Sequence, residues 1–122
     1  MEIEVYQQQG RVPVTIFTIR GDIDAQTYDQ LQNQVQASIQ AGARNVLLDM
    51  AGVNYISSYG VRALSQIYDW LRDTGETPIA GHKSPHVKLV NVSAPVSKVL
   101  ETTGMDLYLD IYSDRENAIA TF

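Results

Sequence analysis

A short apolar run between two helical patterns is the feature that most restricts how this chain can fold. The run is Asn45-Val-Leu-Leu-Asp49, and a continuous apolar stretch of this kind is typical of a strand covered on both faces. Apolar residues recur at helical spacing before the run (Tyr28, Leu31, Val35, Ile39) and after it (Val61, Leu64, Tyr68, Leu71). A buried strand between two helices predicts an α/β fold with a largely parallel sheet.

Four further strands are expected from apolar and β-branched runs. They cover Met1–Tyr6, Val12–Arg20, Val87–Val90 and Leu107–Tyr112. We expect Gln7–Gly10 to form the turn of an opening hairpin. Pro13 is expected at an edge or among the first residues of its strand, because proline cannot donate to a strand ladder. Loops are expected at Met50–Ile56 and, after Gly75 ends the second helix, at Glu76–Pro85.

Capping residues predict where the helices begin and end. Asp24 is the expected N-cap of the helix before the central run, and Gly42 is its expected end. A third helix is expected from Ser93 as N-cap to Gly104, and a short final helix opens with a capping box at Ser113–Glu116. The predicted order of elements is therefore β-β-α-β-α-β-α-β-α.

Composition limits the classes of function. The 122 residues suffice for one domain, 1–122, and the formal net charge of −5 argues against nucleic acid as a partner, because a phosphate backbone needs a basic stripe. The absence of cysteine excludes a disulfide framework, thiolate zinc sites and a cysteine nucleophile. The first residues lack the apolar run of a signal peptide, and no stretch approaches about 18 apolar residues, so we expect no membrane span and a cytoplasmic protein.

The usual motifs of catalysis and cofactor binding are not found. No Gly-Lys-Ser/Thr loop for phosphate and no G-x-S-x-G elbow occurs. His82 and His86 are four residues apart and could bind a metal together only on a helix, but Pro85 between them disfavours a helix there. Asp22 and Asp24 form at most a weak acid/base pair, and a strand-to-helix turn explains them better. We expect no enzyme, no metal and no cofactor.

The most informative segment is Asn54–Leu64, where two serines stand at the start of the second helix. In the simplest interpretation one of them is the N-cap. Gly60 in the first turn lowers helix propensity by ~1 kcal/mol relative to alanine, which suggests a close approach or tight packing there. A helix N-terminus carries unpaired N–H groups and a partial positive charge, so a hydroxyl at this place can take a phosphate without unfolding the domain.

The same segment resembles the STAS family, whose name covers sulfate transporters and anti-sigma factor antagonists. Four stretches resemble the family in the right order: Gly21–Asp24, Asn45–Leu64, Lys88–Leu100 and Ile111–Ala118. The resemblance implies a single STAS-like domain, with a mostly parallel sheet of four or five strands and helices mainly on one face. A domain of this length resembles the bacterial anti-sigma factor antagonists.

In that family the loop before the second helix usually reads Asp-Ser-Ser/Ala/Thr-Gly, and a partner kinase phosphorylates the serine after the Asp. With Gly60 as the anchor, Ser58 takes the phosphorylated position. Ser57 then stands where Asp is usual and is the alternative acceptor, and Tyr59 stands where a small residue is usual. The resemblance implies a partner-binding surface of eight residues: Asp22, Asp24, Tyr55, Ser57, Ser58, Tyr59, Gly60 and Arg62.

The implied function is a binding switch. The unmodified protein binds an anti-sigma factor, often itself a Ser/Thr kinase, phosphorylation at Ser58 releases it, and a PP2C-type phosphatase restores it. A second hypothesis, favoured by Ser57 and Tyr59, is a STAS scaffold or adaptor that is never phosphorylated, in a signalling or lipid-transport complex. A third is a ligand-binding or enzymatic domain built on Asp22, Asp24 and the serines. The expected oligomeric state is a monomer or a weak dimer.

Overall fold

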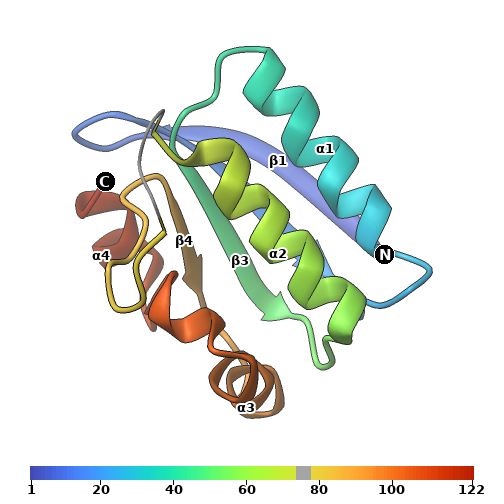
Figure 1. The fold of residues 1–122 in the computed structure, drawn as a ribbon. Coiled ribbons are helices and arrows are strands. Elements are labelled where there is room, and N and C mark those ends of the chain that lie inside the picture. The colour runs from blue at the N-terminus through green and yellow to red at the C-terminus, as the bar shows by residue number, and fades with distance from the viewer. Residues whose placement is uncertain (74–77) are drawn as a thin grey trace.

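The strands of the sheet lie side by side in the order in which they occur in the sequence. The computed structural model describes residues 1–73 and 78–122, and in that part the sheet has five strands in the order β1-β2-β3-β4-β5 (Figure 1). Their bounds are Glu2–Gln9, Pro13–Arg20, Val46–Gly52, Val87–Val90 and Asp110–Tyr112. β1 is antiparallel to β2, and every later neighbour is parallel. The predicted α/β fold with a mostly parallel sheet is confirmed.

Three helices connect the parallel strands and cover one face. They are α1 (Tyr28–Gln40), α2 (Ser58–Leu71) and α3 (Ala94–Thr103). Because parallel crossovers are right-handed and each one here advances by one strand in the same direction, all three helices must fall on the same face. Figure 1 shows α1 and α2 side by side across the sheet. Within the described residues, no helix combines the length and apolar character that crossing a bilayer requires.

The alternation of side chains along the strands divides the core into two clusters. Phe17, Leu48 and Leu89 pack toward α1, α2 and α3. On the other face, a smaller cluster joins the sheet to the short helix α4 (Arg115–Ala120); its fully or nearly fully buried members are Val14, Ile16, Leu47, Val90, Ala118 and Ile119. β3 is buried without interruption over its first five residues, Val46 to Met50, as predicted for a strand covered on both faces.

Two strands are longer than predicted. β1 continues through Gln7–Gln9, which were predicted as a turn, because these residues pair with the first residues of β2. Glutamine suits this position because β1 is an edge strand of the sheet and is largely exposed. β3 likewise runs through Gly52 into the predicted loop.

The second helix is shorter than predicted. α2 ends at Leu71 rather than near Gly75, and Gly75 and Glu76 lie outside the described residues.

Two helices begin differently from the prediction. α1 begins at Tyr28 with Thr27 at the N-cap position, three residues later than an N-cap at Asp24 would place it. Ser93 does occupy the N-cap position of α3, but its hydroxyl donates to the backbone oxygen of Val53 at 3.2 Å instead of capping. Its side chain therefore ties α3 to the residue that follows β3.

The C-terminal part departs from the predicted strand and capping box. A 3₁₀ turn at Met105–Leu107 occupies part of the predicted strand, so that β5 keeps only Asp110–Tyr112. α4 is capped by Asp114, whose carboxylate accepts from the backbone N–H of Glu116 at 3.2 Å. Ser113 therefore does not cap this helix, because a carboxylate one residue later already holds the N–H group.

An ion pair anchors α4 to the centre of the sheet. Asp49 in β3 is 5% exposed, and its carboxylate lies 2.5 Å from the guanidinium of Arg115 in α4. The side-chain amide of Asn91 also donates to Asp49, and Arg115 also donates to the hydroxyl of Tyr6. Burial by itself lowers the pKa of Arg115, because it disfavours the charged form. The hydrogen bond to Asp49 and the electrostatic effects of Tyr6, Asp49 and Glu116 outweigh burial, so the pKa of Arg115 is raised.

We expect Arg115→Gln to lower the free energy of unfolding by about 2 kcal/mol, because it leaves a buried carboxylate without its counter-ion. Arg44→Gln is the matched control: it removes an exposed pair, 3.6 Å from Asp73, and should cost less than about 0.5 kcal/mol. Urea unfolding followed by circular dichroism measures both. Equal losses in the two variants would show that the Asp49 pair does not anchor α4.

Candidate functional site

The eight predicted partner-binding residues all lie at one end of the sheet, on two segments that touch. Asp22 and Asp24 follow β2, and the other six lie between residues 55 and 62, where the chain leaves β3 and enters α2. An isolated parallel bridge between Ile23 and Ile56 joins the segments. Ile23 donates to the backbone oxygen of Tyr55 at 3.1 Å and accepts from the backbone N–H of Ser57 at 2.9 Å.

Ser57 is the N-cap of α2. Its backbone is extended, its hydroxyl oxygen accepts from the N–H of Tyr59 at 3.2 Å, and its backbone oxygen accepts from the N–H of Val61 at 3.0 Å. These contacts satisfy N–H groups that the first turn of a helix otherwise leaves without a partner. The Ser57 side chain is half-buried and already committed to holding the helix end.

Ser58 is the first residue of α2, and its side chain is exposed. Within the described part of the chain, no hydrogen bond engages its hydroxyl. The positive end of the α2 dipole lies at this position, which favours a negative group there. The two serines are therefore not equivalent: one hydroxyl is used by the fold, and the next faces solvent.

Gly60 allows the first turn of α2 to lie directly on the Ile23–Ile56 bridge. A β-carbon added at Gly60 would stand 2.7 Å from the backbone oxygen of Ile23 and closer still to the side chain of Ile56. Both isoleucines are buried, so neither can move aside without opening the core. The close approach suggested by a glycine in the first helical turn is confirmed.

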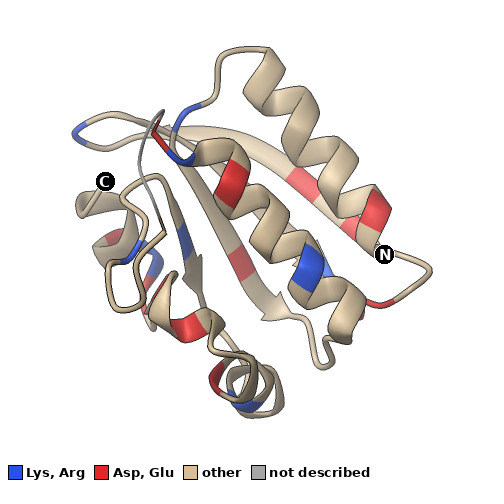
Figure 2. Cartoon of the chain, viewed as in Figure 1, with Lys and Arg blue, Asp and Glu red and all other residues tan. Residues whose placement is uncertain are grey.

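The residue after Ser58 is an aromatic ring that contacts a second ring and an arginine. The ring of Tyr59 packs against that of Tyr28, the first residue of α1, with 5.4 Å between centroids. The guanidinium of Arg62 lies 5.6 Å from the centroid of Tyr59. Tyr55 and Tyr59 are 52% and 42% exposed, so both offer aromatic surface to a partner. Figure 2 shows basic residues spread singly over separate elements.

The two acidic residues hold the turn that carries Ile23. Asp22 is exposed, and its backbone oxygen accepts from the hydroxyl of Thr27 at 2.7 Å. The carboxylate of Asp24 accepts from the N–H of Gln26 at 2.9 Å and lies 3.2 Å from the Thr27 hydroxyl. Asp24 therefore stabilises the turn before α1 rather than capping the helix. Its contacts give it a structural task and supply no paired acid and base.

One residue of this surface was not predicted. Tyr28 was assigned to the apolar stripe of α1, but it is half-buried, and its ring supports Tyr59. A tyrosine at the first turn of a helix gives no sign in the sequence of which neighbour it will meet. The contact depends on the Ile23–Ile56 bridge, which brings the start of α1 beside the start of α2.

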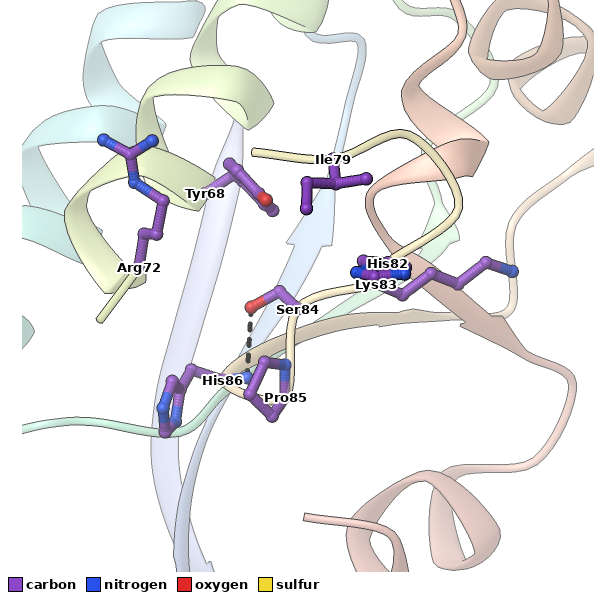
Figure 3. Close-up of a pocket in the computed structure, with 8 residues that line it drawn as sticks. All are labelled: Tyr68, Arg72, Ile79, His82, Lys83, Ser84, Pro85 and His86. Atoms are coloured by element: carbon purple, nitrogen blue, oxygen red, sulfur yellow. Dashed lines mark hydrogen bonds between the residues drawn. The ribbon is translucent and has the colours of Figure 1, made fainter. Parts of the chain in front are cut away.

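The pocket in Figure 3 lies at the opposite end of the sheet, beside the amino ends of β3 and β4. Its volume is about 370 Å³, and its lining residues are Tyr68, Arg72, Ile79, His82, Lys83, Ser84, Pro85 and His86. Figure 3 shows the charged ends of Arg72 and Lys83 pointing to opposite sides. The His86 ring lies between Asn45, at 3.1 Å, and Asp73, at 3.2 Å. The basic groups do not converge on one point.

The third hypothesis requires a pocket around Asp22, Asp24 and the serines. An open hollow at the carboxyl ends of β3, β4 and β5 is lined by Ala51, Asn91, Val92, Ser93, Ile111, Tyr112 and Ser113, and so by none of those four residues. Across residues 1–73 and 78–122, no three His, Asp or Glu side chains come together as a metal site. Ser58 lies with Tyr55 and Tyr59 on an exposed surface rather than in a pocket.

The sequence as a whole matches one family. A family profile described as STAS domain matches residues 2–118. The matched range contains both segments of the surface around Ser58 and all five strands of the described sheet.

Individual relatives cover nearly the same length. BtrV of Bordetella bronchiseptica, provisionally named an anti-sigma factor antagonist, is 27% identical over 107 residues, which is 88% of this chain and 84% of BtrV. The solved structure of an anti-sigma-factor antagonist (STAS) domain protein from Planctomyces limnophilus has a TM-score of 0.75 at 22% identity and covers 98% of this chain and 97% of that one. The Bacillus cell fate determinant SpoIIAA in its phosphorylated form has a TM-score of 0.67 at 16% identity, with 97% and 96% covered. The two structures share the fold of this chain.

We expect Gly60→Ala to destabilise the protein by about 2 kcal/mol, because the added methyl group must displace Ile23 or Ile56 in a closely packed core. Ser65→Ala, at an exposed position of the same helix, is the control and should be neutral or slightly stabilising. Thermal or urea unfolding measures the difference. A Gly60→Ala protein as stable as the control would mean that α2 does not depend on this contact.

Proposed function

Because this chain belongs to the STAS domain family, we propose that it is an anti-sigma factor antagonist that binds its partner through the exposed start of α2. In its unmodified form it binds an anti-sigma factor with Ser/Thr kinase activity, in the cytoplasm, and so frees a sigma factor. Phosphorylation of Ser58 releases it, and a PP2C-type phosphatase restores it. The protein acts by binding and not by catalysis.

The observation that carries the proposal is that the hydroxyl groups of the two serines have different roles. Ser57 holds the helix end through its hydroxyl, whereas the Ser58 hydroxyl is exposed and without a partner in the described part of the chain. A kinase can reach Ser58 without breaking a contact of the fold. The positive end of α2 accommodates the added charge, so the domain stays folded after modification.

The serine at position 57 is compatible with such a switch. The usual residue there in the family is Asp, and Ser and Asp are both strong N-caps because each offers a side-chain oxygen to the first-turn N–H groups. Ser57 fills this role toward Tyr59. The replacement therefore keeps the helix start in place and changes the local charge by one.

The energetics need no change of fold. A phosphoserine adds about −1.5 to −2 charges at neutral pH. An unfavourable charge placed across an interface can cost several kcal/mol, and about 3 kcal/mol already weakens binding more than ~100-fold. The names of BtrV and of the Planctomyces limnophilus protein, and the existence of SpoIIAA in a phosphorylated form, support the same reading.

A non-phosphorylated scaffold or adaptor is the second candidate, and Tyr59 favours it. The residue beside the acceptor is a large ring packed on Tyr28, and it narrows the approach to Ser58 from the side of α1. On this alternative the aromatic surface alone binds a subunit of a signalling or lipid-transport complex. Ser58→Ala would then bind its partner normally, and no phosphorylated form would occur in cells.

We expect the Ser/Thr kinase that binds this chain as its anti-sigma factor, with ATP, to give one phosphoserine at Ser58, detected by mass spectrometry. Ser57→Ala should still be modified and Ser58→Ala should not, because only the second hydroxyl is free. In calorimetry, the partner should bind Ser58→Asp at least ~10-fold more weakly than it binds the unmodified parent protein. It should bind Ser58→Ala about as tightly as the parent. No modification, together with full affinity of Ser58→Asp, would rule out the switch.

A further inference from the structure

The arginine one turn after Ser58 has a weakly held position. Arg62 is exposed in α2, and in the described part of the chain its guanidinium contacts the Tyr59 ring and no carboxylate. By contrast, Arg20, Arg44 and Arg115 each pair with an acidic side chain. A cation over an exposed ring is held by a weak attraction. Arg62 is thus a charged group that a stronger anion nearby can draw away.

Helix geometry aims Arg62 at Ser58. Residues four apart on a helix lie on the same face, and their β-carbons are about 5–6 Å apart. Long side chains on a helix lean back toward its N-terminus, which for Arg62 is the direction of Ser58. An anion placed N-terminal to a cation at this spacing is also the favourable order for a helical ion pair.

We propose that Arg62 responds to the phosphorylation of Ser58. With the free hydroxyl, the guanidinium lies over Tyr59, as the structure has it. With a phosphate at Ser58, it moves from the Tyr59 ring to the adjacent residue and binds the phosphate oxygens. The inference rests on the proposed function, because it takes Ser58 as the modified residue. Arginine suits the task, since its planar fork matches phosphate in two parallel hydrogen bonds.

Phosphorylation and the movement of Arg62 together change the surface in three ways. The phosphate adds negative charge, the guanidinium of Arg62 becomes paired with that phosphate, and the face of the Tyr59 ring becomes uncovered. A partner that used Arg62 in the unmodified complex would lose that contact in addition to meeting the phosphate. The release step would then depend on both residues 58 and 62, and the phosphate would be held by its own chain.

The test places phosphoserine at position 58 during translation, so that it needs neither the kinase nor the partner. Three proteins are compared by ³¹P nuclear magnetic resonance as a function of pH: the parent chain, Arg62→Gln, and Arg72→Gln. The last removes the same charge from the far end of α2. Asp22, Asp24 and the N-terminus of α2 are the same in all three proteins, so they cannot cause a difference between the titration midpoints.

We expect the midpoint of the phosphate titration in the parent and in Arg72→Gln to lie about 0.3 pH unit below that in Arg62→Gln, as an i, i+4 ion pair implies. A fourth protein, Arg62→Lys, should give an intermediate value, because lysine keeps the charge but lacks the planar fork of the guanidinium. In the parent, the Nε–Hε resonance of Arg62 should shift when phosphoserine replaces serine.

Identical midpoints in all three proteins, with an unmoved Arg62 resonance, would overturn the inference and leave the proposed switch standing, since the phosphate alone can release a partner. If the kinase never modifies the chain but the midpoints differ as expected, the pairing is real and the proposed function is wrong. Backbone amide spectra of Arg62→Gln that match those of the parent show that the variant is folded.

Discussion

The contact between Gly60 and the Ile23–Ile56 bridge fixes the position of the segments at the end of the sheet that carries Ser58. The missing side chain lets the first turn of α2 rest on a strand-like pair of residues, and hydrogen bonds of 2.9 and 3.1 Å hold that pair together. Because the bridge joins the turn after β2 to the loop after β3, it also sets where α1 begins. Tyr59 of α2 therefore meets Tyr28 at the start of α1.

The sheet is held differently on its two faces. Three helices bury a large apolar cluster on one face, whereas α4 covers the other with a smaller cluster and the ion pair between Asp49 and Arg115. Removing either partner of this pair would leave a charge unpaired at considerable cost, so the pair favours the observed position of α4. The strand that leads to Ser58 is thus packed on both faces.

Much of this arrangement could be predicted from the sequence. The run at Asn45–Asp49 and the helical spacing around it gave the parallel sheet, and Ser57 could be identified as a candidate cap. The prediction failed where a local pattern had more than one answer. Three glutamines can end a strand or extend an exposed edge, and Asp24 can cap a helix or close a turn before it. The pairing of Tyr28 with Tyr59 depends on how two helices meet, which spacing along either one does not encode.

The pocket near Arg72 and the exposed serine occupy opposite ends of the same parallel strands. A protein seated over the start of α2 would leave the far end in solvent, with its side chains among unchanged neighbours. Lys83, whose side chain is 42% exposed there, is therefore a place for a spectroscopic label. Such a label would follow the tumbling of the whole assembly while leaving the docking contact untouched.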